Sequence, residues 1–353
     1  MFDIMIQSRL KEYGVNFVED FTIPLKKATD EGAFIICDKA VFDTYNDRIL
    51  GSINPERSLV MEASEEAKTL RKCEEIITVL VEQKVRRNQK LIALGGGVVQ
   101  DVTAFIASLL YRGVDWIFFP TTLLAQADSC IGSKTSINFG GYKNLLGGFY
   151  PPSHIYIDLG FLETLPNSEI KSGIGEILHF YLIDDSKLSK PLMDRYDEFI
   201  ETPKKLKEYI LESLKIKKNV IEVDEFDKNQ RNLFNYGHTF GHAIETVTGY
   251  EINHGQAVTM GMDIANFVSL KLGYLSDERF KGMQEVLSRN IPSFSLEDHM
   301  TENYFEALSK DKKNTAGHLG CILTSGPGFM EKVQIPFDDK FKQIILSYFE
   351  LAR

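Results

Sequence analysis

The sequence predicts an α/β N-terminal domain with a parallel-rich sheet, followed by a mostly α-helical C-terminal domain. Two observations favour this fold class. Up to about residue 158, short apolar runs typical of buried strands alternate with helical patterns, as in a parallel sheet with crossover helices. Beyond that point the strand-like runs nearly disappear. A chain of 353 residues can form two domains that each bury a core, and we expect them at 1–158 and 159–353.

The expected elements follow from the spacing of apolar residues. Continuous apolar runs predict buried strands, and apolar residues that recur every three or four positions predict helices. The predicted strands are 34–37, 91–94, 116–119 and 154–157. The predicted helices are 65–83 and 102–110 in the first domain, and 168–182, 204–224, 235–248 and 256–272 in the second.

Composition and charge exclude several classes of protein. A net charge of −10 argues against nucleic acid or an anionic membrane as the main partner. The N-terminus shows no signal-peptide pattern, and the most apolar stretch is interrupted by Arg112 and Asp115, so it cannot span a bilayer. The four cysteines lack CxxC spacing, which argues against disulfides and thiolate metal sites. We expect a cytoplasmic protein.

A glycine-rich turn follows the predicted strand 91–94. Gly95, Gly96 and Gly97 lead directly into a helical pattern, and glycines in this position let backbone N–H groups approach a diphosphate. The turn lacks the G-x-G-x-x-G fingerprint, so an ordinary dinucleotide-binding fold does not follow from it. A tight turn without a ligand is the alternative. Upstream, Glu65 and Lys68 suit a nucleotide ribose or diphosphate, or simply a solvated helix face.

Histidines mark a candidate metal site in the second half. His238 and His242 are four residues apart, so a helix presents both on one face, and His254 and the upstream Glu176 add further ligand types. Imidazoles with a carboxylate suit a catalytic divalent metal, typically zinc. The glycines between the histidines would let a bulky ligand approach the backbone. Surface or capping histidines are the alternative.

A group of cations suggests an anionic ligand. Lys134, Lys143 and Asn144 lie among glycines and hydroxyl residues, which suits a phosphate, although a solvated flexible loop would look the same. Lys217 and Arg231 precede the histidine pair, and together they could clamp a carboxylate.

With these residues assembled, the chain resembles the 3-dehydroquinate synthase branch of the sugar phosphate cyclases over residues 38–323. The motifs occur in the family's order. They are GGGVV-x-D ending at Asp101, Tyr111-Arg-Gly113, Pro120-Thr-Thr-Leu-Leu124, Asp128-Ser, Lys134-Thr, Lys143-Asn, Thr164-Leu-Pro166, Gly237-His-Thr-Phe-Gly-His242, His254-Gly and Asp311-Lys-Lys313.

The resemblance implies a Rossmann-like NAD-binding domain and a metal- and substrate-binding domain. The implied ligands of the divalent metal, zinc or alternatively cobalt, are Glu176, His238 and His254, with His242 beside the substrate rather than on the metal. The residues implied to contact NAD are Asp38, Glu65, Lys68, Gly95, Gly96, Gly97, Asp101, Thr121, Thr122, Lys134, Lys143, Phe161, Thr164 and Glu169.

The same resemblance assigns the substrate contacts. The phosphate is expected on Lys134, Asn144, Asn235 and Lys312, with Arg112 reaching in from the second subunit of a homodimer. Lys217 and Arg231 would hold a carboxylate, and Asp128 would approach the reacting carbons.

The implied reaction converts a phosphorylated seven-carbon keto-sugar acid (DAHP) to 3-dehydroquinate with loss of phosphate. Two other functions stay open. One is a sibling cyclase that makes another carbocycle from a related sugar phosphate. The other is a metal- and nicotinamide-dependent polyol dehydrogenase, which would leave the cation group without a purpose.

Four residues depart from the family pattern. His179 stands where the synthases usually carry lysine, Gln100 and Ser133 replace glycines, and Asp227 stands where glutamate is usual. His179 bears most on the substrate, because imidazole is shorter than a lysine side chain and titrates near neutral pH. We expect His179 to contact the substrate, with simple packing as the alternative.

Overall fold

The computed structural model describes residues 2–140, 142–310, 314, 315 and 317–351. The chain forms two compact units. The first comprises Met1–Pro166 and Pro203–Phe226, and the second comprises Asn167–Thr202 and Asp227–Arg353. Helix α8 (Lys207–Val223) is therefore part of the first unit, although it follows the expected boundary in sequence. It packs on the short π-helix Ala125–Ser129 of that unit.

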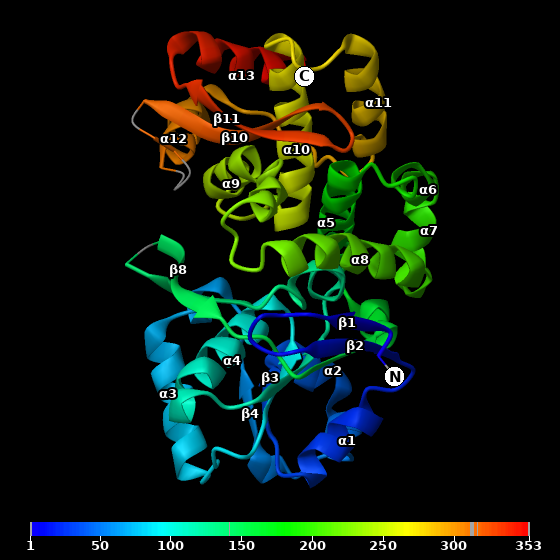
Figure 1. Cartoon of the computed structure of the whole chain (residues 1–353), viewed down its shortest axis with the longest axis vertical. Helices are drawn as coiled ribbons and strands as arrows, with labels where there is room; N and C mark the ends of the chain where they lie inside the picture. The colour runs from blue at the N-terminus through cyan, green and yellow to red at the C-terminus, as the bar shows by residue number, and fades with distance from the viewer. Residues whose placement is uncertain (1, 141, 311–313, 316, 352–353) are drawn as a thin grey trace. The chain divides into compact units, whose positions relative to one another are not determined.

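The first unit contains a seven-stranded sheet with the order β1-β2-β9-β6-β5-β3-β4. All neighbouring strands are parallel except β1 and β2, so the parallel-rich sheet is confirmed (Figure 1). The four predicted strands are the four central ones. The strands are β1 (Ile4–Ile6), β2 (Tyr13–Val18), β3 (Phe34–Asp38), β4 (Ser58–Met61), β5 (Leu91–Gly95), β6 (Trp116–Pro120) and β9 (His154–Asp158).

Besides α8, the α-helices described in the first unit are α1 (Thr22–Asp30), α2 (Lys39–Leu50), α3 (Leu70–Glu82) and α4 (Gly97–Leu109). Residues of α1 and α2 pack with alternate residues of β3, β5 and β6 in one buried cluster. The predicted helix 65–83 starts later, because Thr69 caps the amide of Lys72 and begins α3.

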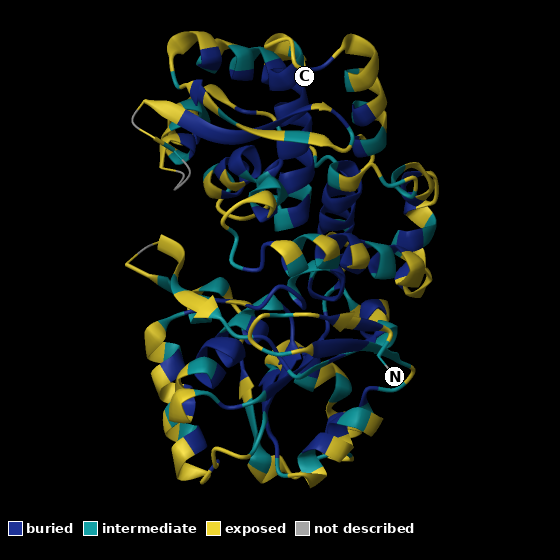
Figure 2. Cartoon of the chain, in the orientation of Figure 1, coloured by how far each residue is buried: buried dark blue, intermediate teal, exposed yellow. Residues whose placement is uncertain are grey.

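An antiparallel hairpin projects from the first unit, and the sequence did not predict it. Its strands are β7 (Lys134–Phe139) and β8 (Tyr142–Phe149). Most of β8 is exposed, as Figure 2 shows, so it lacks the apolar run by which the central strands are recognised.

The second unit is mostly helical, as predicted. Its α-helices are α5 (Asn167–Asp184), α6 (Ser189–Asp194), α7 (Tyr196–Glu201), α9 (His238–Val247), α10 (His254–Lys271), α11 (Asp277–Leu287), α12 (Asp298–Ser309) and α13 (Asp339–Leu351). An unpredicted hairpin, β10 (His318–Gly326) and β11 (Phe329–Pro336), packs on α10 (Figure 1).

Helix α10 is the centre of the second unit. It is buried along most of its length and contacts α5, α9, α11, α13 and β10 (Figure 2). Glycines permit its closest contacts. A Cβ on Gly175 of α5 would lie 2.0 Å from the carbonyl oxygen of Gly255, and one on Gly255 would lie 1.7 Å from that of Ser172. Only glycine fits at these two positions, so backbone contact fixes the spacing of α5 and α10.

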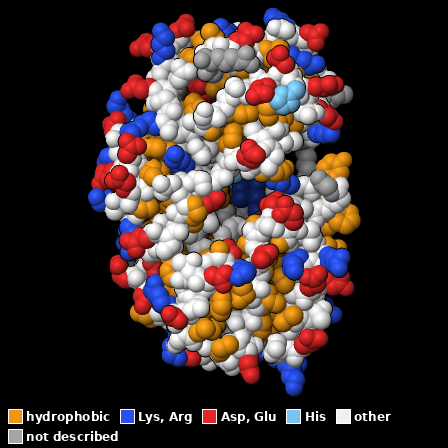
Figure 3. Space-filling model, turned by 180° about the vertical axis from the view of Figure 1, so that it is seen from behind, with side chains coloured by type: hydrophobic (Ala, Val, Ile, Leu, Met, Phe, Trp, Pro, Cys, Tyr) orange, Lys and Arg blue, Asp and Glu red, His pale blue; other side chains and the backbone are white. Residues whose placement is uncertain are grey.

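The surface of the chain carries charges of both signs. Acidic and basic side chains are intermingled on the face shown in Figure 3. Among the described residues, no helix combines the length and the apolar character needed to cross a bilayer.

A buried carboxyl group in α10 gives a stability prediction. Burial raises the pKa of Asp263, which accepts a hydrogen bond from the Tyr348 hydroxyl at 2.8 Å. A folded-state pKa above the unfolded value means that stability is lost as pH rises from the unfolded to the folded value. Asp263→Asn should therefore raise the stability at neutral pH by about 0.5–2 kcal/mol. Urea unfolding from pH 4 to 8 should show the gain shrinking towards acid, and a pH-independent gain would contradict this account.

Candidate functional site

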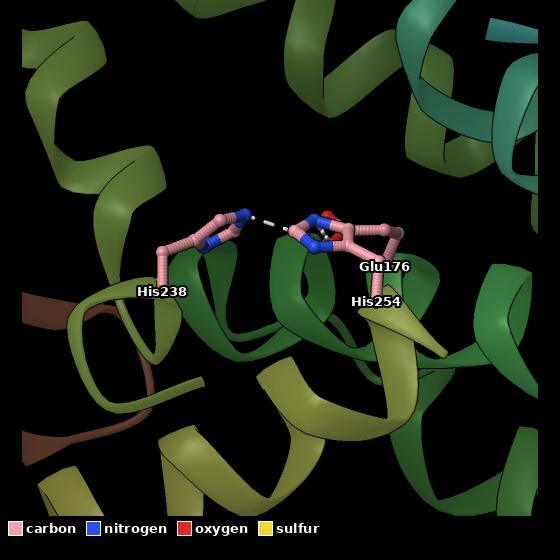
Figure 4. A group of neighbouring side chains, drawn as sticks. All are labelled: Glu176, His238 and His254. Carbon is pink, nitrogen blue, oxygen red and sulfur yellow. Dashed lines mark ion pairs between the residues drawn. The ribbon is translucent and has the colours of Figure 1, made fainter. Parts of the chain in front are cut away.

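Three predicted metal ligands meet in the second unit. Glu176 comes from α5, while His238 and His254 are the first residues of α9 and α10. One ligand atom from each residue lies within 4.8 Å of the others. The Glu176 Oε1 atom is 3.6 Å from His238 Nε2 and 3.2 Å from His254 Nε2 (Figure 4). The trio is thus the right size to close around one ion.

The outer nitrogens of both imidazoles are engaged, which leaves the inner ones for a metal. His238 Nδ1 lies 3.2 Å from the carbonyl oxygen of Tyr236 and can donate to it. His254 Nδ1 lies 3.2 Å from Glu245 Oε2. Such partners hold a metal-binding histidine in the tautomer whose Nε2 carries the lone pair. Two imidazoles and a carboxylate in this arrangement suit zinc or cobalt.

Burial and mutual charge set the protonation of the trio. Burial alone would raise the pKa of Glu176. The neighbouring imidazoles lower it by a larger amount, so its net pKa lies well below the usual range. Burial holds the pKa of His238 well below its usual value. Burial also lowers the pKa of His254, but hydrogen bonds to Glu176 and Glu245 raise it well above its usual value. The site therefore favours a cation, and a divalent metal would displace the proton on His254.

The glycines around His238 have a different role from the one expected. We expected these glycines to let a ligand approach the backbone, but they instead let helix α10 approach it. Gly237 has φ +79° at the N-cap of α9, and a Cβ there would meet Met262 of α10 at 2.5 Å. A Cβ on Gly241 would lie 2.9 Å from the carbonyl oxygen of Ala257, also in α10. These glycines bring the two ligand-bearing helices together.

Glu245 supports the site and was missed in the sequence. It lies seven residues after His238, two helical turns further along the same face of α9, and this spacing is the signal that could have found it. We predict that Glu245→Gln weakens metal binding about 10- to 100-fold, because the carboxylate orients His254. Competition with a chelator measures this affinity. Glu251→Gln, at an exposed position, is the control, and equal affinities for the two variants would contradict the orienting role.

Two further histidines flank the trio. His242 is exposed, and its ring stacks on that of His254 with centroids 5.7 Å apart. This agrees with a place beside the metal ligands. His179 is only 1% exposed, with its Nδ1 3.7 Å from Glu176 Oε2 and its ring 4.9 Å from that of His238. The His179 ring also packs against the ring of Phe180. A contact between His179 and the substrate stays a prediction.

The glycine turn lies at the carboxyl end of β5, where α4 begins. A Cβ on Gly95 would strike Val99 at 2.7 Å, and one on Gly96 would strike Thr122 at 2.9 Å. A Cβ on Gly97, the first residue of α4, would meet nothing within 4 Å, so there is open space beside this residue. A helix N-terminus beside close-packed glycines suits a diphosphate. Asp38 ends the neighbouring strand β3, but its carboxylate accepts from the Ala40 amide as the cap of α2.

A polar network joins several predicted residues of the first unit. Lys68 Nζ lies 2.8 Å from both Asp101 Oδ2 and Asn144 Oδ1. Asn138 donates to the side chain of Glu65 at 2.9 Å. Ser136, which also bonds Asp101, and Asn138 were not predicted. They share one face of β7 with Lys134, and polar residues at every second position are the signal that could have found them.

Lys217 and Asp128 form a charged pair in the first unit. The Lys217 ammonium donates to Asp128 Oδ1 at 2.8 Å and to its backbone oxygen at 2.7 Å. The lysine side chain is 7% exposed and that of the aspartate 22%. Lys217, predicted to bind a carboxylate of the substrate, thus already holds a carboxylate of the protein.

The remaining predicted residues are distributed over both units. Glu169 accepts from Asn253, the residue before His254. Arg231 is buried, and Asn235 donates to the carbonyl of Asn232. Lys312 lies outside the described residues. The others in the first unit are the exposed Arg112, Lys134, Lys143 and Thr164, the half-buried Thr122, and the buried Thr121 and Phe161.

Comparisons with known proteins agree with this arrangement. Residues 58–172 match the family described as 3-dehydroquinate synthase N-terminal, and residues 173–314 match 3-dehydroquinate synthase C-terminal. A 3-dehydroquinate synthase of Alkaliphilus oremlandii is 37% identical over 320 residues, which cover 90% of this chain and 86% of that protein.

Two solved structures show the same architecture. A 2-deoxy-scyllo-inosose synthase complexed with carbaglucose-6-phosphate, NAD+ and Co2+ superposes with a TM-score of 0.86 at 25% identity, covering 98% of this chain and 99% of the other. The 2-epi-5-epi-valiolone synthase of Streptomyces hygroscopicus, with NAD+ and Zn2+ bound, gives a TM-score of 0.81 at 24% identity over 98% and 99% of the two chains.

Proposed function

The chain belongs to the 3-dehydroquinate synthase family, and on this premise we propose that it converts DAHP to 3-dehydroquinate and phosphate. The observation that carries the proposal is the trio of Glu176, His238 and His254, whose inner ligand atoms face one another. We propose zinc as its metal, NAD as a recycled cofactor at the glycine turn, and the cytoplasm as the location.

The chain's own residues would bind and orient the substrate. The proposed phosphate contacts are Lys134, Asn144, Asn235 and Lys312. Lys217 and Arg231 would bind the carboxylate, with Asp128 near the reacting carbons. When bound, the metal polarises a hydroxyl group and NAD accepts and returns a hydride. The protein's part is largely the positioning of one flexible anion.

Retention of two cations favours DAHP over the substrates of sibling cyclases. Lys217 and Arg231 are both buried, and both belong to the carboxylate clamp that the family resemblance implies. A neutral sugar phosphate offers no carboxylate to bind them. A polyol dehydrogenase is disfavoured by Lys134 and Asn144, the proposed phosphate contacts, because a polyol carries no phosphate group.

The deciding experiment is turnover with little cofactor. The purified protein is incubated with DAHP, Zn2+ and NAD at one hundredth of the substrate concentration. Release of inorganic phosphate and the product's NMR spectrum are followed. Phosphate release far beyond the NAD supplied, with 3-dehydroquinate as product, is expected. A different carbocycle would identify a sibling cyclase, and stoichiometric NADH without phosphate release would identify a dehydrogenase.

We further propose a homodimer in which Arg112 serves the second subunit. Arg112 is exposed and has φ +64°, next to Tyr111 at +52°, so a strained turn holds this arginine at the surface of the first unit. Mixing inactive Arg112→Ala and Glu176→Ala subunits should restore roughly a quarter to a half of the activity, because mixed dimers keep one intact site. Verified mixed dimers without activity would show that Arg112 serves its own subunit.

A further inference from the structure

Two residues at which the sequence departs from the pattern it resembles form side-chain hydrogen bonds that hold one short segment. This segment, residues 125–134, runs from the π-helix Ala125–Ser129 to the start of β7 and carries both Asp128 and Lys134. In the pattern that the sequence resembles, glycine occupies the positions of Gln100 and Ser133. A glycine has no side chain to bond, whereas both of these side chains do.

Gln100 ties the segment to the helix that follows the glycine turn. Its amide nitrogen donates to the backbone oxygen of Ser129 at 2.6 Å, and the Ser129 hydroxyl donates to its amide oxygen at 2.6 Å. Gln100 is 6% exposed and lies in the first turn of α4. This two-way bond fixes both the backbone and the side chain of the residue after Asp128.

Ser133 joins the other end of the segment to Glu225, two residues beyond the end of α8. Its hydroxyl donates to Glu225 Oε1 at 2.9 Å, and Glu225 is also held by the Ser8 hydroxyl and the Arg9 amide. Ser133 has φ +64°, a conformation that glycine adopts at less cost. Ser133 is strained, and its hydroxyl donates to the buried carboxylate of Glu225. We infer that this hydrogen bond provides a benefit that offsets the cost of the strained backbone.

We infer that Gln100 and Ser133 are positioning residues that brace the 125–134 segment and thereby place Asp128 and Lys134 for the reaction. The inference rests on the proposed function, which gives those two residues their roles. The Gln100 bond lies next to Asp128 and its partner Lys217, so it acts on the chemical step. The Ser133 bond precedes Lys134, so it acts on phosphate binding.

The test separates positioning from stability. Ser133→Gly relieves the strained backbone, so the melting temperature should stay or rise. The dissociation constant of inorganic phosphate, measured by calorimetry with NAD and Zn2+ present, and the KM for DAHP should each rise about 3- to 10-fold. Ser133→Ala removes the hydroxyl but keeps the side-chain carbon, so it should raise both values to the same extent as Ser133→Gly. Lys84→Gly, an exposed residue at φ +55°, is the control and should change neither.

The Gln100 bond is tested by a double-mutant cycle. Gln100→Leu and Ser129→Ala should each lower kcat about 3- to 10-fold with little change in KM, and the double variant should lose less than the product of the two. Suppose that Ser133→Gly and Gln100→Leu show wild-type kinetics while Lys134→Ala still weakens phosphate binding. That result would overturn the positioning role of Gln100 and Ser133 and leave the proposed role of Lys134 standing. Unchanged phosphate binding in Lys134→Ala would overturn the proposed role of Lys134 and the brace with it.

Discussion

Glu176→Ala is expected to release the metal and to lower turnover by at least about a thousandfold, because a metal that polarises an oxygen contributes several kcal/mol to the barrier. Glu176 is the one carboxylate of the trio, and its Oε1 atom faces both Nε2 atoms. Its loss removes the negative charge that favours a cation at this site. His238→Ala should act in the same way.

The measurement is metal content by elemental analysis together with turnover of DAHP. His299→Ala is the matched control, because that imidazole is 76% exposed and belongs to the same unit. Full metal content and normal turnover in Glu176→Ala would show that the ion binds elsewhere. The second histidine and glutamate group, His242, Glu245 and His254, would then be the place to look.

Lys217→Met should have the second largest effect, a loss of at least about 100-fold in kcat/KM, because removing one partner of a buried charge pair costs several kcal/mol. The ammonium would disappear from beside Asp128, leaving a partly buried carboxylate with one partner fewer. Stability should fall as well. Lys215→Met, on the same helix at an exposed position, is the control.

A double variant distinguishes the two consequences. Asp128→Asn in the Lys217→Met background removes the stranded charge, so the unfolding midpoint should recover while turnover does not. Recovery of both would mean that the pair matters only for folding. Recovery of neither would place the destabilisation in the packing of the lysine's alkyl chain.

The central strands were predictable because each is a continuous apolar run between turn residues. The hairpin β7–β8 was not, since its exposed face and its glycines remove the pattern that a buried strand shows. In β10 an apolar run is present, but it is too short to be distinguished from a buried helical segment.

Residue type suggested a metal site, because histidines and a carboxylate are common metal ligands. The family resemblance then selected Glu176, His238 and His254, which the structure brings together. The backbones of Gly175 and Gly255 are in contact although the two residues are eighty positions apart. No local sequence pattern predicts this contact. The bonds of Gln100 and Ser133 are equally non-local, so these residues looked like simple departures from a pattern.

The glycine contact between α5 and α10 also bears on how such a protein can change over time. Gly175 precedes Glu176, and Gly255 follows His254, so each ligand is covalently next to a point where two backbones touch. The separation of those ligands is thus set by main-chain atoms, which substitutions do not alter. The surrounding apolar side chains can drift through many combinations while the ligands stay in place. The sequence of this unit can therefore diverge while its metal site is preserved.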